Sequence, residues 1–334
     1  MVGESVSGAA SNSALAHRHR RTASTLRGLA LLTVVITVIA GCRSSQQSAP
    51  SSASAPPSSP VAPPSPVALP FKGLIHPSGV AVDSAGNVYV ADSILNRVLK
   101  LAAGSNTPVE LPFTGLQAPN GVAVDTVGNV YVADGPTTRA DDSYVNPRVL
   151  KLPAGAKSQV ELPFTDTDTP TGVAVDTAGD VYVAYMHIPP DTESRVFKLP
   201  AGAKRQVELP FTGLVFPDGV ALDAAGSVYV PDGRRMLKLP AGANAQVELP
   251  FTDLDTPGGV AVDTVGNLYV ADSNGHNSNG RVLKLPAGTE IPYALSFTGL
   301  QDAEGVAVDT AGNVYVTNVF PAGAGGQVLK LPAG

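Results

Sequence analysis

One fourteen-residue motif occurs six times in this chain and constrains its fold more than any other feature. The copy GVAVDTVGNVYVAD runs from Gly121 to Asp134. Close copies begin at Gly79, Gly172, Gly219, Gly259 and Gly305. Successive copies begin 40 to 51 residues apart, and self-similarity at such a period is typical of solenoids and β-propellers.

Each repeat contains four short segments with the composition of β-strands. GVAVD and NVYVAD are rich in β-branched and aromatic residues, RVLKL follows them, and VELPF closes the unit. Gly, Pro and Asp bound these apolar runs, and no run has helical spacing. Such runs indicate strands buried on both faces, as in a sheet between two propeller blades. The sequence therefore predicts an all-β, six-bladed β-propeller of four-stranded antiparallel blades over residues 67–334.

The two ends of the repeat region predict how the ring closes. The last repeat stops at residues 328–334 (VLKLPAG), and no VELPF segment follows it. The first repeat is preceded by an extra segment of that kind, residues 67–71 (VALPF). We expect this N-terminal strand to complete the last blade, so that the ring has no open sheet edge.

The full repeat, VELPFTGLxxPxGVAVDxxGNVYVADxxxxRVLKLPAG, resembles the NHL repeat. In this form it is similar to the extracellular sensor propellers of mycobacterial receptor serine/threonine kinases. The resemblance covers residues 67–334 and implies a six-bladed propeller that acts in recognition outside the membrane. We expect the sensor fold without kinase activity, because these 334 residues contain no Gly-rich phosphate loop and no VAIK, HRD or DFG motif.

Residues 1–41 resemble a bacterial lipoprotein signal peptide. A basic segment with four arginines (residues 18–27) precedes the apolar residues 28–39, a run that is short for a membrane-spanning helix. The run leads into Ile-Ala-Gly-Cys at residues 39–42. In lipoproteins the cysteine at this place is acylated, so the resemblance implies a lipid anchor on Cys42. Arg20-Arg21 leaves export by the general secretory or the twin-arginine route open.

The segment after Cys42 and the charge of the chain restrict the partners. Residues 42–66 are rich in Ser, Pro and Ala without apolar periodicity, which predicts a disordered tether behind the lipidated cysteine. Without residues 1–41 the formal charge changes from −6 to −9, because 18 basic and 27 acidic residues remain. An acidic chain is unsuited to nucleic acid. We expect an exported monomer in the cell envelope, anchored at Cys42 to the outer face of the cytoplasmic membrane.

Only one kind of connection changes in length among the repeats. From the last residue of the second strand to the first of the third, repeats one to six have 6, 15, 11, 4, 10 and 10 residues. In an antiparallel blade these loops share a face with the connections from the fourth strand to the next repeat. Variable loops on a rigid frame commonly carry recognition. Neutral drift at tolerant hairpin tips is the alternative interpretation.

We therefore expect that face to bind a protein or another ligand of the envelope. The candidate contact residues are His76, Arg139, Asp141, Asp142, Tyr144, Tyr185, His187, Asn274 and His276. The aspartates of the repeated Asp-x-x-Gly turns and those that end the second strands are predicted to be structural, as capping or ion-pairing groups. The repeated tyrosine is predicted to pack between blades.

An enzymatic function is the alternative to binding. His76, His187 and His276 could hold a catalytic zinc with an open position. This arrangement resembles that of metal-dependent NHL-propeller lyases, and streptogramin lyases are also propellers with related repeats. No motif positions a further carboxylate or tyrosine, so we expect no catalytic residue, no bound metal and no cofactor. A purely structural or adhesive role is a third possibility.

Overall fold

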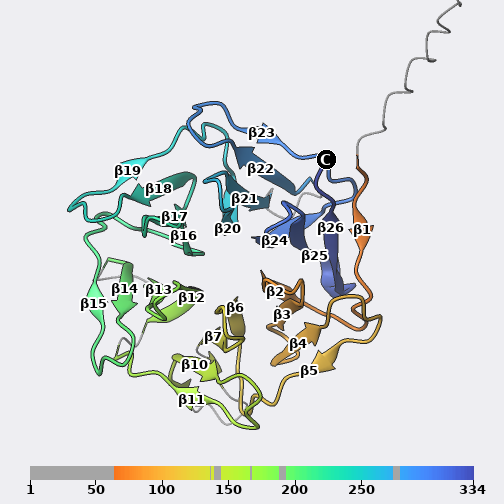
Figure 1. The fold of residues 1–334 in the computed structure, drawn as a ribbon, viewed down its shortest axis with the longest axis horizontal. Helices are drawn as coiled ribbons and strands as arrows, with labels where there is room; N and C mark the ends of the chain where they lie inside the picture. Colours follow the sequence, from red (N-terminus) through yellow and green to blue (C-terminus); the bar gives the residue numbers. More distant parts are fainter. Residues whose placement is uncertain (1–63, 136, 139–143, 166–167, 188–192, 274–278) are drawn as a thin grey trace, which may run out of the picture. The chain divides into compact units, whose positions relative to one another are not determined.

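The computed structural model describes residues 64–334 except 136, 139–143, 166–167, 188–192 and 274–278. In residues 64–334, six four-stranded antiparallel sheets are arranged in a ring around a central axis (Figure 1). The predicted all-β six-bladed propeller is confirmed. Within the described residues, no helix has the length and apolarity needed to cross a membrane. The predicted signal peptide, Cys42 and most of the predicted tether lie outside these residues.

The blades follow one another in chain order, and each runs from an innermost strand to a two-residue outermost strand. Blade 1 comprises β2 (Pro77–Val82), β3 (Val88–Asp92), β4 (Arg97–Leu101) and β5 (Val109–Glu110). Blade 2 comprises β6 (Pro119–Val124), β7 (Val130–Asp134), β10 (Arg148–Leu152) and β11 (Val160–Glu161), with β8 (Thr137–Thr138) and β9 (Tyr144–Val145) paired in its long loop. Blade 3 comprises β12 (Thr169–Val175), β13 (Val181–Met186), β14 (Arg195–Leu199) and β15 (Val207–Glu208).

The other three blades have the same order of strands. Blade 4 comprises β16 (Ala221–Leu222), β17 (Val228–Asp232), β18 (Arg235–Leu239) and β19 (Val247–Glu248). Blade 5 comprises β20 (Thr256–Val262), β21 (Leu268–Ser273), β22 (Arg281–Leu285) and β23 (Tyr293–Ala294). Blade 6 comprises β24 (Asp302–Val308), β25 (Val314–Val319), β26 (Gly326–Leu331) and β1 (Val67–Ala68), with the 3₁₀ turn η1 (Pro321–Gly323) between β25 and β26.

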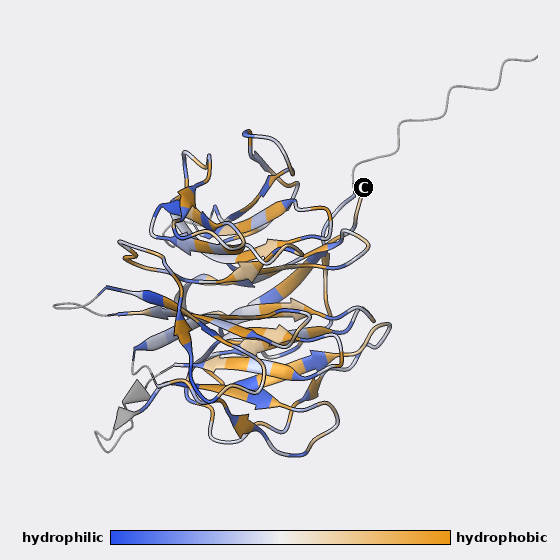
Figure 2. Cartoon of the chain, turned by 60° about the vertical axis from the view of Figure 1, so that its left-hand side comes forward, coloured by the Kyte–Doolittle hydropathy of each residue, from blue (hydrophilic) through white to orange (hydrophobic). Residues whose placement is uncertain are grey.

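The hydrophobic core lies between adjacent blades. The second strand of every blade is buried, apart from Met186 at the end of β13, because its two faces pack against neighbouring sheets. Hydrophobic residues run through the strands of the whole ring (Figure 2). Tyr89 of blade 1 packs with Val122 and Val132 of blade 2. The predicted packing of the repeated tyrosine between blades is confirmed.

The Asp-x-x-Gly turns are held by their aspartates. Asp83 accepts hydrogen bonds from the backbone N–H groups of Ala85 and Asn87, from the Asn87 side chain at 2.7 Å and from the Tyr89 hydroxyl at 2.9 Å. Partial burial alone would raise the pKa of Asp83, but these hydrogen bonds hold it below its ordinary value. Gly86 supplies the left-handed conformation of the turn, with φ at 80°. The predicted structural role of the turn aspartates is confirmed.

The aspartates at the ends of the second strands are also structural. Asp134 accepts hydrogen bonds from the backbone N–H groups of Gln117 and Ala118 and is paired with Arg148 at 3.0 Å. Blades 1, 4 and 5 repeat this arrangement with Asp92, Asp232 and Asp272. Blade 6 replaces the charged pair by Asn318 and Gln327, and the Asn318 oxygen accepts the same two backbone bonds. The backbone hydrogen bonds and arginine ion pairs of these carboxylates therefore hold the loops and strands of the propeller together.

The N-terminal strand closes the ring as predicted. Val67 pairs with Lys330 and Ala68 with Leu329, which makes β1 the outermost strand of blade 6. The Leu69 N–H then donates to the Val328 carbonyl at 2.9 Å. Phe71 follows as a buried residue of the hydrophobic core that also contains residues of blades 1 and 6.

A ring of glycines allows the six innermost strands to approach one another closely. These are the glycines that open the repeated motif, at positions 79, 121, 172, 219, 259 and 305. A Cβ atom at Gly172 would lie 2.7 Å from Cα of Gly219 in the next blade. At Gly305 it would lie 2.7 Å from the Ser78 carbonyl oxygen, across the closure between blades 6 and 1. The glycine is thus repeated because any side chain would push neighbouring backbones apart.

Candidate functional site

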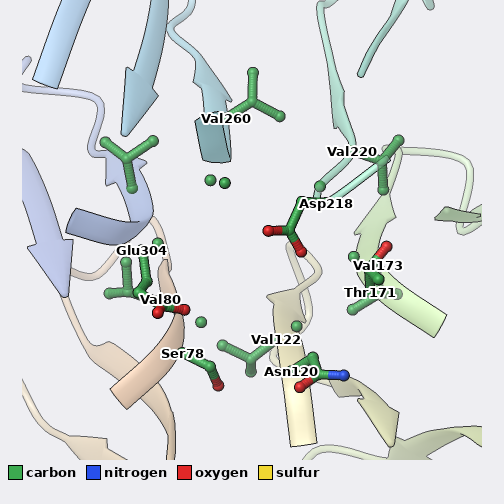
Figure 3. Close-up of a pocket in the computed structure, with 18 of the residues that line it drawn as sticks. Ser78, Val80, Asn120, Val122, Thr171, Val173, Asp218, Val220, Val260 and Glu304 are labelled. Atoms are coloured by element: carbon green, nitrogen blue, oxygen red, sulfur yellow. The ribbon is translucent and has the colours of Figure 1, made fainter. Parts of the chain in front are cut away.

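A pocket of about 130 Å³ lies on the axis of the ring, and all six blades contribute to its wall, blade 4 through the residues directly before β16. In each blade the residue directly before the ring glycine lines the pocket, as Figure 3 shows for the five of them that carry side chains. We call this set the axial ring. It consists of Ser78, Asn120, Thr171, Asp218, Gly258 and Glu304. Two positions further along each strand a valine also lines the pocket, because alternate residues of a strand point to the same side.

Three members of the axial ring join neighbouring blades. The Ser78 hydroxyl donates to the Pro119 carbonyl at 2.8 Å. The Asn120 amide donates to the Pro170 carbonyl at 3.3 Å. The Thr171 hydroxyl donates to the Pro217 carbonyl at 2.7 Å. In each case a polar side chain satisfies a backbone acceptor of the next blade, which is a structural role.

Asp218 and Glu304 do not follow that pattern, because a carboxylate has no proton to donate. The Asp218 carboxylate points into the pocket (Figure 3), and no donor from the described residues lies within hydrogen-bond distance of it. The Nε2 atom of His76 lies 3.6 Å from the Oε1 atom of Glu304. Gly258 separates the two acids along the ring, and a Cβ atom there would lie 3.6 Å from Asp218 Oδ2.

The surroundings of the two acids disfavour their ionisation. Water in the pocket reaches the Asp218 side chain, but the enclosing strands remove much of its hydration, and this desolvation raises the pKa of Asp218 to about 6. Desolvation is also the main reason why the pKa of Glu304 rises to about 8, and the nearby charges of Asp302 and Asp218 add to it. No lysine or arginine is among the described residues that line the pocket. The axial pocket therefore holds two acids whose ionised forms have no lysine or arginine partner among the described lining residues.

The pocket opens on the face that carries the loops of variable length. In blade 1 the N–H of Ser93, in the loop between the second and third strands, donates to the carbonyl of His76 on the pocket wall at 3.0 Å. The Gly135 N–H of blade 2 bonds the Ala118 carbonyl in the same way. The two kinds of loop expected to share a face are thus in contact. We call this the variable face.

The described candidate residues of the variable face have different surroundings. His76 lines the pocket, and its Nδ1 lies 3.1 Å from the Ser93 hydroxyl. His187 is paired with Asp168 of its own blade, with 2.7 Å between Nδ1 and Oδ1, and does not line the pocket. Tyr185 is only 1% exposed and packs in the core. It therefore does not present a contact surface.

The remaining candidates cannot be placed as side chains. Tyr144 belongs to β9, of which the structure describes the backbone pairing with β8. Outside the described residues lie Arg139, Asp141, Asp142, Asn274 and His276. Among the described residues, no group of three or more His, Cys, Asp or Glu side chains converges as a metal-binding set.

Sequence reasoning missed Asp218 and Glu304. The signal that could have found them is the residue before the repeated glycine, which is Ser, Asn, Thr, Asp, Gly and Glu in blades 1 to 6. It is different in every copy of an otherwise uniform motif. Because the ring brings these six positions to one axis, a position variable in the sequence becomes a variable surface in the structure.

Comparison with known proteins agrees with the architecture. Residues 74–101, which contain β2, β3 and β4, match the model of the NHL repeat. This match covers three of the four strands of blade 1. A 41-residue stretch, 11% of this chain, is 61% identical to the serine/threonine-protein kinase PknD of Mycobacterium tuberculosis. The NHL-containing chain spans only 6% of the length of that kinase.

Solved propellers share the fold of this six-bladed ring at low sequence identity. A gluconolactonase from Xanthomonas campestris aligns with a TM-score of 0.55 and 16% identity, over 79% of this chain and 89% of that one. A chain of the nidogen/laminin complex aligns with a TM-score of 0.56 and 19% identity, over 69% of this chain and 84% of that one. At such identity the likeness concerns the fold alone.

Proposed function

We propose that this protein is a non-catalytic binding propeller that recognises an envelope or extracellular ligand through its variable face. It is exported, and acylated Cys42 anchors it to the outer surface of the cytoplasmic membrane. Residues 42–66 act as a tether that holds the propeller away from the lipid. The bound ligand is a protein or another component of the envelope.

One observation carries this proposal: the differences among the six blades are concentrated on one face. The loops between second and third strands range from 2 to 13 residues, not counting the flanking strand residues, and contact the loops that flank the axial pocket. The residues of the axial ring also differ from blade to blade, while the Asp-x-x-Gly turns on the opposite face are repeated. A rigid frame with variable loops on one side is a common design for recognition.

The resemblance of the repeats to the sensor propellers of mycobacterial receptor kinases supports a location outside the cytoplasm, and the stretch that matches PknD is 6% of that kinase. The lipoprotein-like residues 1–42 support it independently. The nidogen/laminin complex supports the idea that a propeller of this fold can serve in extracellular binding.

A loop exchange tests the binding face without damage to the frame. Residues 135–147 of blade 2 are replaced by Gly-Arg, the two-residue turn that joins Asp232 to Arg235 in blade 4. The Asp134–Arg148 pair then takes the place of the Asp232–Arg235 pair, so the blade should fold. The control replaces Val127, which is 71% exposed in a turn of the opposite face, by Ser.

Each purified full-length protein is cross-linked to intact envelopes, and the captured components are quantified by mass spectrometry. We expect the wild type and Val127→Ser to capture the same component, and the loop exchange to reduce that capture at least about tenfold. Equal capture by all three proteins would contradict a binding role for the variable face.

A further inference from the structure

We propose that the axial pocket binds a primary ammonium group, presented by a lysine side chain or by a free amino terminus of the ligand. This inference rests on the proposed binding function and names the chemistry that the variable face recognises. It concerns Asp218 and Glu304, the two members of the axial ring that do not bond a neighbouring blade.

The first argument is the balance of charge. Asp218 and Glu304 line one pocket, and Asp302 adds further negative charge beside Glu304. The described lining contains no lysine or arginine, and His76 contacts only Glu304 of the two acids. Ionisation of two desolvated acids that face one cavity is unfavourable unless a cation joins them. A bound cation would remove this cost, so the pocket is poised to attract one.

The second argument is that the neutral polar groups of the ring are already engaged. Ser78, Asn120 and Thr171 direct their donors at proline carbonyls of the next blade. They therefore do not donate to the two carboxylates, which keep their acceptor capacity for a ligand. An ammonium group is a compact cation with three donors, which suits two carboxylates on one side of a ring.

The third argument is the shape of the pocket. Its volume of about 130 Å³ is several times the roughly 10–15 Å³ that one water molecule needs, enough for an ammonium group and the first part of an alkyl stem. Gly258 has no side chain and leaves room between Asp218 and Glu304. Val220 and Val260 lie two positions after Asp218 and Gly258 and give this part of the pocket an apolar wall.

The same features distinguish an ammonium group from a divalent metal ion. Calcium takes six to eight oxygen ligands and magnesium demands a near-octahedral set. The described residues offer two carboxylates here, and no set of three or more ionisable ligands converges. Two carboxylates match the three N–H donors of an ammonium group better than they match the ligand set of calcium or magnesium.

The test is isothermal titration of the full-length protein in detergent with n-butylammonium chloride at pH 8, at constant ionic strength. n-Butanol and tetramethylammonium serve as probes that lack the charge and the N–H donors, respectively. Asp218→Asn and Glu304→Gln keep the shape of each side chain. Glu110→Gln, on exposed outermost strand β5, is the matched control. Circular dichroism and melting curves verify that each variant is folded.

We expect saturable binding of n-butylammonium to the wild type and to Glu110→Gln, with at least about tenfold weaker binding to Asp218→Asn. The two other probes should not bind. The proposal is overturned by absent saturation, by equal affinity of Asp218→Asn, or by stoichiometric calcium or magnesium binding that requires Asp218. If the protein does not bind the amine while the loop exchange still abolishes envelope capture, only the ammonium site is refuted and the proposed binding function stands. If the amine binds but the loop exchange does not change envelope capture, the proposed function of the variable face is refuted.

Discussion

The His76 imidazole lies 3.6 Å from the Glu304 carboxylate, and this contact joins the first blade to the last. The two residues are far apart in the sequence and meet on the wall of the axial pocket because β1 closes the ring in blade 6. The same closure brings Gly305 against the Ser78 carbonyl. The wall of the pocket is therefore complete only when the ring is closed.

The stability of the protein should decrease as the pH rises from about 5 to about 8. The native pKa values of Asp218 and Glu304, about 6 and about 8, exceed their ordinary values, so the folded state binds more protons than the unfolded state in this window. The groups facing Glu304 are His76, Asp218 and Asp302. Turn aspartates such as Asp83 have lowered pKa values and titrate below the window.

The double variant Asp218→Asn, Glu304→Gln should remove most of this pH dependence and raise the melting temperature at pH 8 by roughly 2–4 °C. Melting curves between pH 5 and pH 8 measure both effects. A wild-type slope that persists in the double variant would show that other groups cause it.

Deletion of residues 67–71 should strongly destabilise the propeller. It removes the outermost strand of blade 6 and buried Phe71, so the melting temperature should fall by roughly 10 °C. Deletion of residues 43–66 is the matched control and should leave the melting temperature unchanged. Calorimetry on both proteins decides the matter, and equal melting temperatures would refute the closure argument.

Gly172→Ala should destabilise the ring by about 1–3 kcal/mol, because the added methyl group would meet the backbone of Gly219. Gly334→Ala is a suitable control, since its Cβ atom would have no neighbour closer than 3.8 Å. Urea unfolding measures both free energies. A Gly172→Ala protein as stable as the control would mean that the innermost strands can separate freely.

Cys42→Ala should abolish membrane anchoring if Cys42 is acylated. The wild type should enter the detergent phase in a phase-partition experiment, whereas the variant should remain in the aqueous phase. The folded propeller is a suitable internal standard, because its melting temperature should not change. Unchanged partitioning of the variant would refute the lipoprotein assignment.

The repeats made most of the frame predictable. Strand type, blade number and closure by residues 67–71 follow from the period and the ends of the repeat, and the roles of Asp83 and Asp134 follow from turn and capping chemistry. Tyr185 was predicted as a contact residue, but the structure buries it between Phe164 and Phe197, at a position where blades 1, 2, 4 and 5 have a capping aspartate.

The axial pocket could not be predicted from the sequence of any single repeat. Asp218 and Glu304 are surrounded by apolar strand residues and glycine, and each acid alone is indistinguishable from a solvated residue at a strand end. Only the closed ring places them at one axis, where both lose hydration and repel each other. A comparison of the six copies position by position is the sequence signal that points to them.

The most direct test of the central claim is to mask each face in turn. In a Cys42→Ala background, a cysteine replaces Ile94, which is 58% exposed on the variable face, or Val265, which is 71% exposed on the opposite face. Each cysteine is coupled to polyethylene glycol, and binding to the captured envelope component is measured. The account predicts that modification at position 94 abolishes binding and that modification at position 265 leaves it intact. Loss of binding only after modification at position 265 would contradict it.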